Sequence, residues 1–410
     1  MQRGDMPSST PPSPHGLSAR YSPCAARHTP LLRLATVVLL AVALGGCVSS
    51  GVDQARRQFY AGRLSEAGES LAELDDDDGK DRVLLLMERG MIKHTDGDHA
   101  SAVRDWLDAI TRIQQLDYVS LSEKTASMVI NDRTETYTGR PYERALLHAF
   151  IAKSYFALGQ WREAAVEARL IADGFENLND FPDDAYSRYI AGLAFELIRD
   201  LNGSRIEYGR ADELTPLLRI NPASGNIAPT NTPRADIPRT IGSHELICLI
   251  SIGRTPPYPA SRQSIHNTNW GLNPYAEIIH DGKILGRSYT LNTTGNLAAL
   301  TEKRIAAIKA AKTVTRLVIK DSIADAVADN NLLLGEVLRL LLFALEMPDT
   351  RQWETLPQWL QVARVPCPPD LDTAEVVLRN ASGRILRRAT ITGASLTRSG
   401  DKTITILRVW

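Results

Sequence analysis

The sequence is poor in the features that mark several classes of protein. It has four cysteines in 410 residues, which excludes a small fold held together by a disulfide framework. Aromatic residues make up only 6%, and the formal net charge of −1 provides no strong basic field that would attract nucleic acid. Hydrophobic residues still make up 43% and charged residues 23%, an ordinary composition for a chain that buries a core. The length predicts two or three domains.

Motifs for hydrolytic and nucleotide chemistry are also missing. The sequence has no His-Glu-x-x-His, no Gly-x-Ser-x-Gly and no Gly-x-x-x-x-Gly-Lys-Ser/Thr. Ser399 and Lys402 have the Ser-x-x-Lys spacing of penicillin-binding enzymes, but they are predicted to lie in a turn between strands rather than at a helix start. His94 and His99 are separated by a turn at Gly97 and make no zinc-type ligand set. We therefore expect a protein that is not an enzyme and that carries no metal or cofactor.

The N-terminus has the pattern of a secretory leader. A Ser- and Pro-rich segment with several arginines gives way to an apolar run from Leu34 to Leu44, which is shorter than the ~20 residues that a spanning helix needs. Two small residues, Gly45 and Gly46, then precede Cys47. A basic leader, a short apolar core and small residues predict a signal peptide over residues 1–46.

The order Leu44-Gly45-Gly46-Cys47 resembles the lipobox of bacterial lipoproteins, in which the cysteine is lipidated and becomes the first residue. The resemblance implies a covalent lipid with acyl chains such as palmitate on Cys47, and each buried CH₂ supplies ~0.8 kcal/mol of membrane affinity. Val48 rather than Asp comes next, which implies the outer membrane, facing the periplasm, with residues 47–52 as a tether. The inner membrane and the cell surface stay open, as does a plain N-terminal anchor with a coincidental cysteine.

Residues 53–220 are predicted to be helical and to repeat a helix-turn-helix pattern. Small residues recur where the two helices of a hairpin would touch, and aromatic residues fill the space toward the next hairpin. The residues that carry the four copies are Gly62, Ala67 and Leu71; Gly90, Gly97, Ala102 and Trp106; Ala152, Tyr155, Gly159, Ala164 and Ala168; and Gly192, Phe195, Tyr208 and Ala211. The pattern resembles the tetratricopeptide repeat (TPR), whose copies stack into a superhelix with a concave surface.

A TPR-like array predicts a groove that binds an extended peptide or a helix of a partner protein. The groove would be lined by exposed polar residues on the first helix of each hairpin. The candidates are Arg89, Lys93, His148, Lys153 and Arg188.

The C-terminal part changes to a pattern of strands. A Pro-, Asn- and Ser-rich linker is predicted over residues 221–243, followed by a β-rich domain over residues 244–410. Period-two alternation around turn pairs such as Asp281-Gly282 predicts hairpins. We expect these strands to form a sandwich or an open sheet.

The β-rich domain contains a helical interruption and two cysteines. The interruption is predicted at about residues 296–347, and Glu336 and Arg339 inside its apolar run argue against a second membrane segment. Cys248 and Cys367 lie in strand-like contexts. They are expected either to pair in an oxidising compartment or to stay as small buried hydrophobes.

Two motifs stand out beside the repeats. One runs from Asn131-Asp132-Arg133 to Glu167-Ala168-Arg169, and the other is Asp349-Thr350-Arg351-Gln352-Trp353-Glu354-Thr355-Leu356-Pro357. Together they resemble a family of uncharacterised bacterial lipoproteins with TPR-like N-terminal halves. The resemblance implies no catalytic residue. In the second motif we expect Asp349 and Arg351 to form an ion pair or to cap the end of the preceding helix, and Trp353 to pack beneath Arg351. We expect Leu356-Pro357 to lead into the strand that follows. This motif then forms either a corner between helix and sheet or a contact with a partner.

The sequence thus predicts an α+β multidomain lipoprotein, with a TPR-like helical repeat array followed by a β-rich domain. We expect a scaffold that recruits an envelope protein in the periplasm while the lipid fixes its location. The alternative is a regulator or activator of a peptidoglycan synthase or hydrolase by direct contact. A peptidoglycan-acting enzyme would need a pocket with convergent titratable groups. The partner and the oligomeric state stay open, and nucleic acid is not expected.

Overall fold

The computed structural model describes residues 47–74, 79–122, 136–177, 183–232, 244–256, 273–305 and 349–409. The chain divides into two compact units, Met1–Ser49 and Ser50–Trp410, and the sheets and nearly all of the helical residues belong to the second. The predicted signal peptide, residues 233–243 of the predicted linker and most of the predicted helical interruption lie outside the described residues. No helix in the described part of the chain has the length and apolar character that crossing a bilayer requires.

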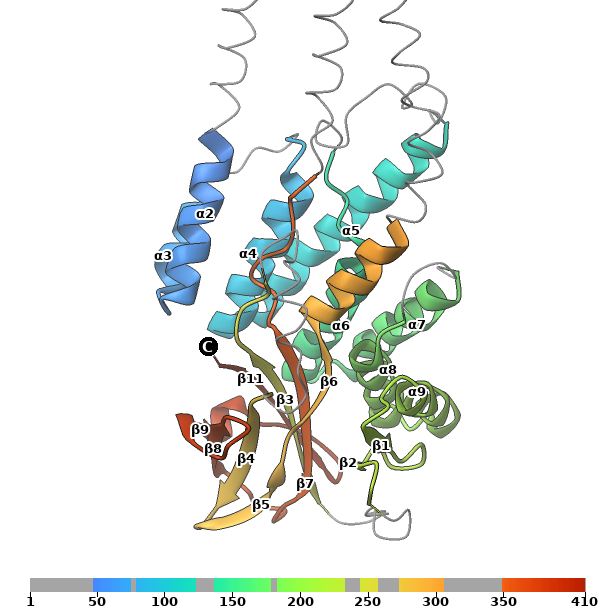
Figure 1. Cartoon of the computed structure of the whole chain (residues 1–410), viewed down its shortest axis with the longest axis vertical. Coiled ribbons are helices and arrows are strands. Elements are labelled where there is room, and N and C mark those ends of the chain that lie inside the picture. The colour runs from blue at the N-terminus through green and yellow to red at the C-terminus, as the bar shows by residue number, and fades with distance from the viewer. Residues whose placement is uncertain are drawn as a thin grey trace, which may run out of the picture. The chain divides into compact units, whose positions relative to one another are not determined.

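The N-terminal part consists of helices that follow one another as hairpins along one side of the sheets (Figure 1). Their bounds are α2 Cys47–Tyr60, α3 Leu64–Ala72, α4 Arg82–Asp96, α5 His99–Ser122, α6 Pro141–Ala157, α7 Trp161–Asn177, α8 Ala185–Leu197 and α9 Leu201–Glu213. These are the four predicted helix-turn-helix copies. Residues 47–52, predicted to be a tether, are instead the first part of α2, which begins at Cys47.

The turns of the hairpins have a common backbone conformation. Gly62, Gly97 and Gly159 have positive φ angles of 75°, 90° and 69° and lie between the two helices of the first three hairpins. Glycine adopts this left-handed conformation without steric cost. The fourth turn uses Arg199, with φ 64°, at the same place.

Two further glycines let the helices of a hairpin come close together. A Cβ atom at position 90 would lie 2.2 Å from the indole nitrogen of Trp106, and one at position 192 would lie 2.7 Å from the ring of Tyr208. Both pairs join the two helices of the same hairpin. Each aromatic residue covers the glycine of its own hairpin, and the ring of Trp106 also lies 6.2 Å from that of Phe150 on α6, toward the next hairpin as predicted.

The C-terminal part forms two antiparallel or mixed sheets that pack face to face (Figure 1). The five-stranded sheet has the order β10-β11-β3-β7-β6, in which β11 and β3 are parallel, and the four-stranded sheet has the order β5-β4-β8-β9. The strand bounds are β3 Glu245–Ile252, β4 Tyr275–His280, β5 Lys283–Arg287, β6 Tyr289–Thr293, β7 Trp359–Pro366, β8 Thr373–Arg379, β9 Ile385–Thr392, β10 Thr397–Ser399 and β11 Lys402–Val409. Asp281 and Gly282 form the β4–β5 turn, as predicted. The strands were predicted to form a sandwich or an open sheet, and the structure shows the sandwich.

The five-stranded sheet is buried on both faces. Ile247 and Leu249 of β3 belong to the hydrophobic core shared with the helices, whereas Leu246, Cys248 and Ile250 belong to the core between the two sheets. Alternate side chains of a strand point to opposite faces, so one strand serves both cores. The prediction of two domains joined by a linker is therefore corrected: the helices and sheets form one unit of three layers.

Three smaller predictions can be compared with the described residues. The segment predicted to begin the linker carries a short antiparallel pair, β1 Leu218–Ile220 with β2 Ile227–Pro229. Cys248 and Cys367 are both free thiols, and Cys248 is fully buried, so they do not form the disulfide that was one of the two expectations. After β6 the chain is helical over residues 294–305, which covers the start of the predicted helical interruption.

Candidate functional site

The residues predicted to line a groove are held inside the helical hairpins. Arg89 pairs with Asp105 at 2.9 Å, and Lys93 pairs with the same carboxylate at 2.7 Å. The Nδ1 atom of His148 lies 2.6 Å from Glu167. In each case the basic residue is on the first helix of a hairpin and the acid is on the second.

Arg188 and Lys153 are buried, which contradicts the prediction that they line an open groove. Arg188 is 3% exposed and bonds Glu207 at 2.9 Å, the same first-to-second-helix pairing. Lys153 is 0% exposed, and its Nζ donates a hydrogen bond of 3.0 Å to the hydroxyl of Ser251 on β3. The helix face on which Lys153 lies is thus covered by the five-stranded sheet.

A segment of the C-terminal part of the chain also packs against the helices. We call residues 349–357 the docking segment. The carboxylate of Glu143 on α6 accepts a hydrogen bond of 2.9 Å from the backbone N–H of Trp353. Glu88 on α4 accepts the next two N–H groups, those of Glu354 at 3.0 Å and Thr355 at 3.2 Å. Three consecutive backbone donors are therefore held by two buried carboxylates.

Side chains complete the contact between the docking segment and the helices. Trp353 is 0% exposed, and its ring centroid lies 6.0 Å from those of Trp106 and Phe150. Arg351 pairs with Asp349 at 2.8 Å, as predicted, and with Asp81 at 2.6 Å. The ring beneath Arg351 is that of Tyr137, at 5.4 Å, rather than Trp353 as predicted.

The end of the docking segment joins the five-stranded sheet. Leu356 is fully buried, and the carbonyl of Pro357 accepts a hydrogen bond of 2.8 Å from the hydroxyl of Thr294. β7 begins two residues later, at Trp359. The motif thus leads into β7 and packs against the helices of the N-terminal part, while the helix that was expected to precede it lies outside the described residues.

Burial changes the acid–base behaviour of these carboxylates and phenols. Desolvation raises the pKa of Glu143, against the opposing effect of Arg140 and of the N–H and O–H groups that donate to it. Desolvation, with the nearby charge of Glu143, also raises the pKa of Tyr137 well above its usual range. The Tyr137 hydroxyl donates a hydrogen bond to the Glu143 carboxylate.

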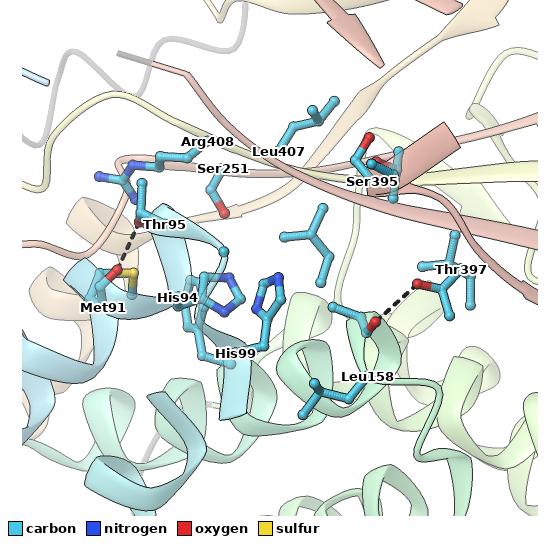
Figure 2. A pocket seen from close by; sticks show the side chains of 17 residues that line it. Met91, His94, Thr95, His99, Leu158, Ser251, Ser395, Thr397, Leu407 and Arg408 are labelled. Atoms are coloured by element: carbon cyan, nitrogen blue, oxygen red, sulfur yellow. Dashed lines mark hydrogen bonds between the residues drawn. The ribbon is translucent and has the colours of Figure 1, made fainter. Parts of the chain in front are cut away.

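A pocket lies where the helices meet the edge of the five-stranded sheet, and we call it the His94–His99 pocket (Figure 2). Its volume is about 370 Å³. Its wall includes α4, the start of α5, the end of α6, β3 and β11. The residues that line it include Met91, His94, His99, Phe150, Leu158, Ser251, Ile404, Thr405, Leu407 and Arg408.

The two histidines of this pocket stand edge to face. Their ring centroids are 5.0 Å apart with an interplanar angle of 76°, and the Nδ1 atom of His94 lies 2.7 Å from the hydroxyl of Ser154. The turn at Gly97, which separates the two residues in the sequence, folds the start of α5 back on α4 (Figure 2). Within the described residues, no group of three or more His, Cys, Asp or Glu side chains is arranged to hold a metal ion.

The bases in and beside the pocket are shifted toward their neutral forms. Desolvation, followed by the charge of Lys153, lowers the pKa of His99 to about 4 and that of His94 well below its usual range. Desolvation lowers the pKa of Arg408 to about 10 and that of Lys153 well below its usual range. The Nη2 atom of Arg408 donates to the carbonyls of Gly253 at 2.9 Å and Thr355 at 3.1 Å.

Sequence reasoning singled out the two histidines and missed the rest of the pocket. Ser251, Thr405 and Arg408 lie more than a hundred residues away along the chain, and no spacing pattern connects them with α4. The Ser399–Lys402 spacing lies in the β10–β11 turn, as predicted, and the Nζ of Lys402 is 2.5 Å from the Glu245 carboxylate.

The solved structures that we compare with this chain are distant from it. No family model matches the chain, and the search of curated proteins gives no match. Among solved structures, MamA from Desulfovibrio magneticus RS-1 is similar over 41% of this chain and 76% of its own, with 16% identity and a TM-score of 0.28. A putative kinesin light chain from Podosopora anserina with nearly identical TPR-like repeats is similar over 40% of this chain and 92% of its own, with 15% identity and a TM-score of 0.23.

Proposed function

We propose that this protein is a lipid-anchored lipoprotein of the bacterial envelope that acts as a protein-binding scaffold and not as a catalyst. The lipobox around Cys47 supports the anchor, which would hold the protein at the outer membrane on its periplasmic side. The partner would be another envelope protein, recruited by raising its local concentration at the membrane.

The scaffold proposal rests on which faces of the helices are exposed. The inner face, which is the side of the helices that packs against the five-stranded sheet and the docking segment, is covered by the chain itself. Trp353 and Lys153 are fully buried there, so this face does not bind a partner. The outer helices instead expose large apolar side chains: Val166 and Leu170 of α7 are 50% and 42% exposed, and Leu201 and Ile206 of α9 are 64% and 58% exposed. Apolar patches on a protein surface often mark sites of interaction with other proteins.

The tight packing of these helices against the rest of the protein also suits a scaffold. Because the inner face is fixed by buried hydrogen bonds and ion pairs, the outer helices need little ordering when a partner binds. A preformed surface loses less conformational entropy on association than a flexible one.

Site-specific photo-crosslinking in living cells tests the scaffold proposal. We would place the crosslinker at Ile206 on α9 and, as a matched exposed apolar control, at Ile284 on β5, which is 61% exposed. The proposal predicts that one envelope protein is captured at Ile206 and not at Ile284. Capture at Ile284 alone, or at neither position in a folded protein, would contradict it.

Mass spectrometry of the membrane fraction tests the anchor separately. We expect the mature chain to begin at Cys47 and to carry acyl chains there, and we expect Cys47→Ala to abolish lipid-dependent attachment. An unmodified Cys47 in membrane-bound protein would refute lipidation without affecting the crosslinking result.

A further inference from the structure

We propose that β9, at the edge of the four-stranded sheet, binds an extended acidic segment of a partner protein as an added strand. A strand that is added in this way is held by backbone hydrogen bonds along the free side of the edge strand, and its alternate side chains give specificity. The proposal does not rest on the scaffold function of the outer helices, because β9 belongs to the second sheet and not to α7 or α9 (Figure 1).

The outer side of β9 is a long, exposed edge. β9 pairs with β8 on one side, and among the described residues no strand pairs with its other side. Ile391 is the only buried residue of the strand, whereas Ile385 and Leu386 are 40% and 53% exposed. Because successive residues of a strand point to opposite faces, the first half of β9 is open on both faces. Its free side therefore presents a row of backbone N–H and C=O groups.

The other edges of the two packed sheets are protected. β10 has three residues, and its Thr397 hydroxyl is hydrogen-bonded to the end of α6. β6 is buried over most of its length, and Asn292 on it bonds Asp184 beside α8. β5 pairs with β4 through a register shift, and a Cβ atom at Gly286 would lie 2.5 Å from Val365 of β7. Short, irregular or covered edges prevent unwanted pairing, and β9 has none of these features.

The charge around β9 indicates the chemistry of the partner. Residues 380–400 contain four arginines and no aspartate or glutamate. Two of these, Arg387 and Arg388, are adjacent in the exposed half of β9. Arg388 pairs with Glu375 of β8, but the two side chains are 55% and 35% exposed, and pairs as exposed as this contribute little. Pairing with β9 of a second copy would bring these arginines together, and their repulsion opposes it. An acidic segment is therefore the complementary partner.

The order of side chains in β9 defines this segment further. Ile385 and Arg387 share one face of the strand, and Leu386 and Arg388 share the other, so each face presents an apolar side chain followed by a guanidinium. Opposite charges and apolar side chains that face each other across two strands both stabilise the pair. An antiparallel partner strand therefore fits when two adjacent acidic residues lie opposite the arginines and are followed by two β-branched apolar residues.

Binding of short peptides to the full chain tests this proposal, measured by fluorescence anisotropy in a non-ionic detergent. The probe is the dye-labelled octapeptide Thr-Val-Thr-Thr-Glu-Glu-Val-Val, and the comparison peptide has Lys-Lys in place of Glu-Glu. We expect the acidic peptide to bind at least tenfold more tightly than the basic one. No binding of the acidic peptide, or equal binding of the two, overturns the proposal.

N-methylation distinguishes an added strand from attraction by charge alone. A strand directs the N–H groups of alternate residues toward one neighbour, and methylation removes these donors. One acidic peptide carries N-methyl groups at its third, fifth and seventh residues, and another at its fourth, sixth and eighth. We expect one of the two to lose at least tenfold in affinity and the other to bind like the parent peptide. Equal affinities of the two methylated peptides overturn the proposal.

A charge swap locates the peptide on β9. In the double variant Arg387→Glu with Arg388→Glu, the acidic peptide should bind at least tenfold more weakly and the Lys-Lys peptide at least tenfold more tightly, a reversal that misfolding cannot produce. The matched control is Lys283→Glu with Arg287→Glu on β5, the other basic edge strand, which should leave both affinities unchanged.

The same variants can contradict the proposal. Acidic-peptide affinity that is unchanged in the β9 variant, or that falls equally in the β5 variant, overturns it. Should the β9 double variant fail to fold, Arg387→Gln decides the outcome, because this side chain is exposed and the substitution removes only its charge. Arg387→Gln should weaken the acidic peptide at least threefold, and an unchanged affinity overturns the proposal.

Discussion

Glu88 and Glu143 are the residues whose chemistry is most closely tied to the packing of the helices on the C-terminal half. Glu88 accepts hydrogen bonds from Arg56 at 2.7 Å and 2.9 Å, from two backbone N–H groups and from the Thr355 hydroxyl at 2.5 Å. Arg56 also pairs with Glu354 at 3.0 Å. One buried carboxylate therefore satisfies several donors from α2 and from the docking segment, which are far apart in the sequence.

Removing the charge of Glu88 tests this arrangement. We expect Glu88→Gln to lower the free energy of unfolding by about 3 kcal/mol, because Arg56 would keep a buried charge with a weaker partner. Glu66→Gln is the control: it removes a comparable pair with Arg63 in which both side chains are about half exposed, and it should cost under about 0.5 kcal/mol. Urea denaturation measures both, and equal losses in the two variants would contradict the role given to Glu88.

The histidines of the pocket predict how stability changes with pH. His99 has a folded pKa of about 4, below its usual value of 6.5, so the unfolded chain binds a proton there between these pH values and the folded chain does not. Stability therefore falls as pH drops from about 6.5 toward 4. We expect His99→Gln to lose less thermal stability than the native protein between pH 7 and pH 5. Parallel pH curves of melting temperature would show that His99 contributes nothing.

At the scale of elements, the turns of the helical hairpins follow one rule with one exception. Gly62, Gly97 and Gly159 adopt the left-handed conformation that glycine favours, and Arg199 adopts it at the cost of a clash between its Cβ and the following carbonyl. No atom would lie within 4 Å of a Cβ added at Gly97, so conformation alone determines the effect of a substitution there.

The hairpin turns therefore give a pair of opposite predictions. Arg199→Gly should raise the free energy of unfolding by about 1 kcal/mol, and Gly97→Ala should lower it by about 1 kcal/mol, because only the second places a side chain in a left-handed turn. Thermal unfolding followed by circular dichroism measures both. Destabilisation by Arg199→Gly would mean that the arginine side chain contributes more than its backbone strain costs.

Local sequence patterns predicted the helical hairpins and the turns. They did not predict contacts between segments that are distant in the sequence. Gly62, Gly97 and Gly159 marked three of the hairpins, and Asp281-Gly282 marked the β4–β5 turn, because each acts within a few residues. The pairing of Glu88 with Thr355 joins residues 267 positions apart and leaves no periodic trace in the sequence. For the same reason Lys153, a charged residue on a helix, gave no sign that a strand covers it.

At the scale of the whole described unit, the protein is three layers: helices, a doubly buried five-stranded sheet and a second sheet. The alternation of β3 explains this arrangement, since odd and even residues enter different cores. A helical array that the sequence predicted as an open groove thus has its inner face covered from within the chain.

Hydrogen exchange of the docking segment tests this account most directly. In the full chain under native conditions, the amides of Trp353, Glu354 and Thr355 should exchange as slowly as those of Ile247 and Leu249 in the central strand, because all would require opening of the same core. Exchange of the three amides as fast as that of the exposed turn between β8 and β9, while β3 stays protected, would contradict the claim that the chain's own segment fills the inner face of the helices.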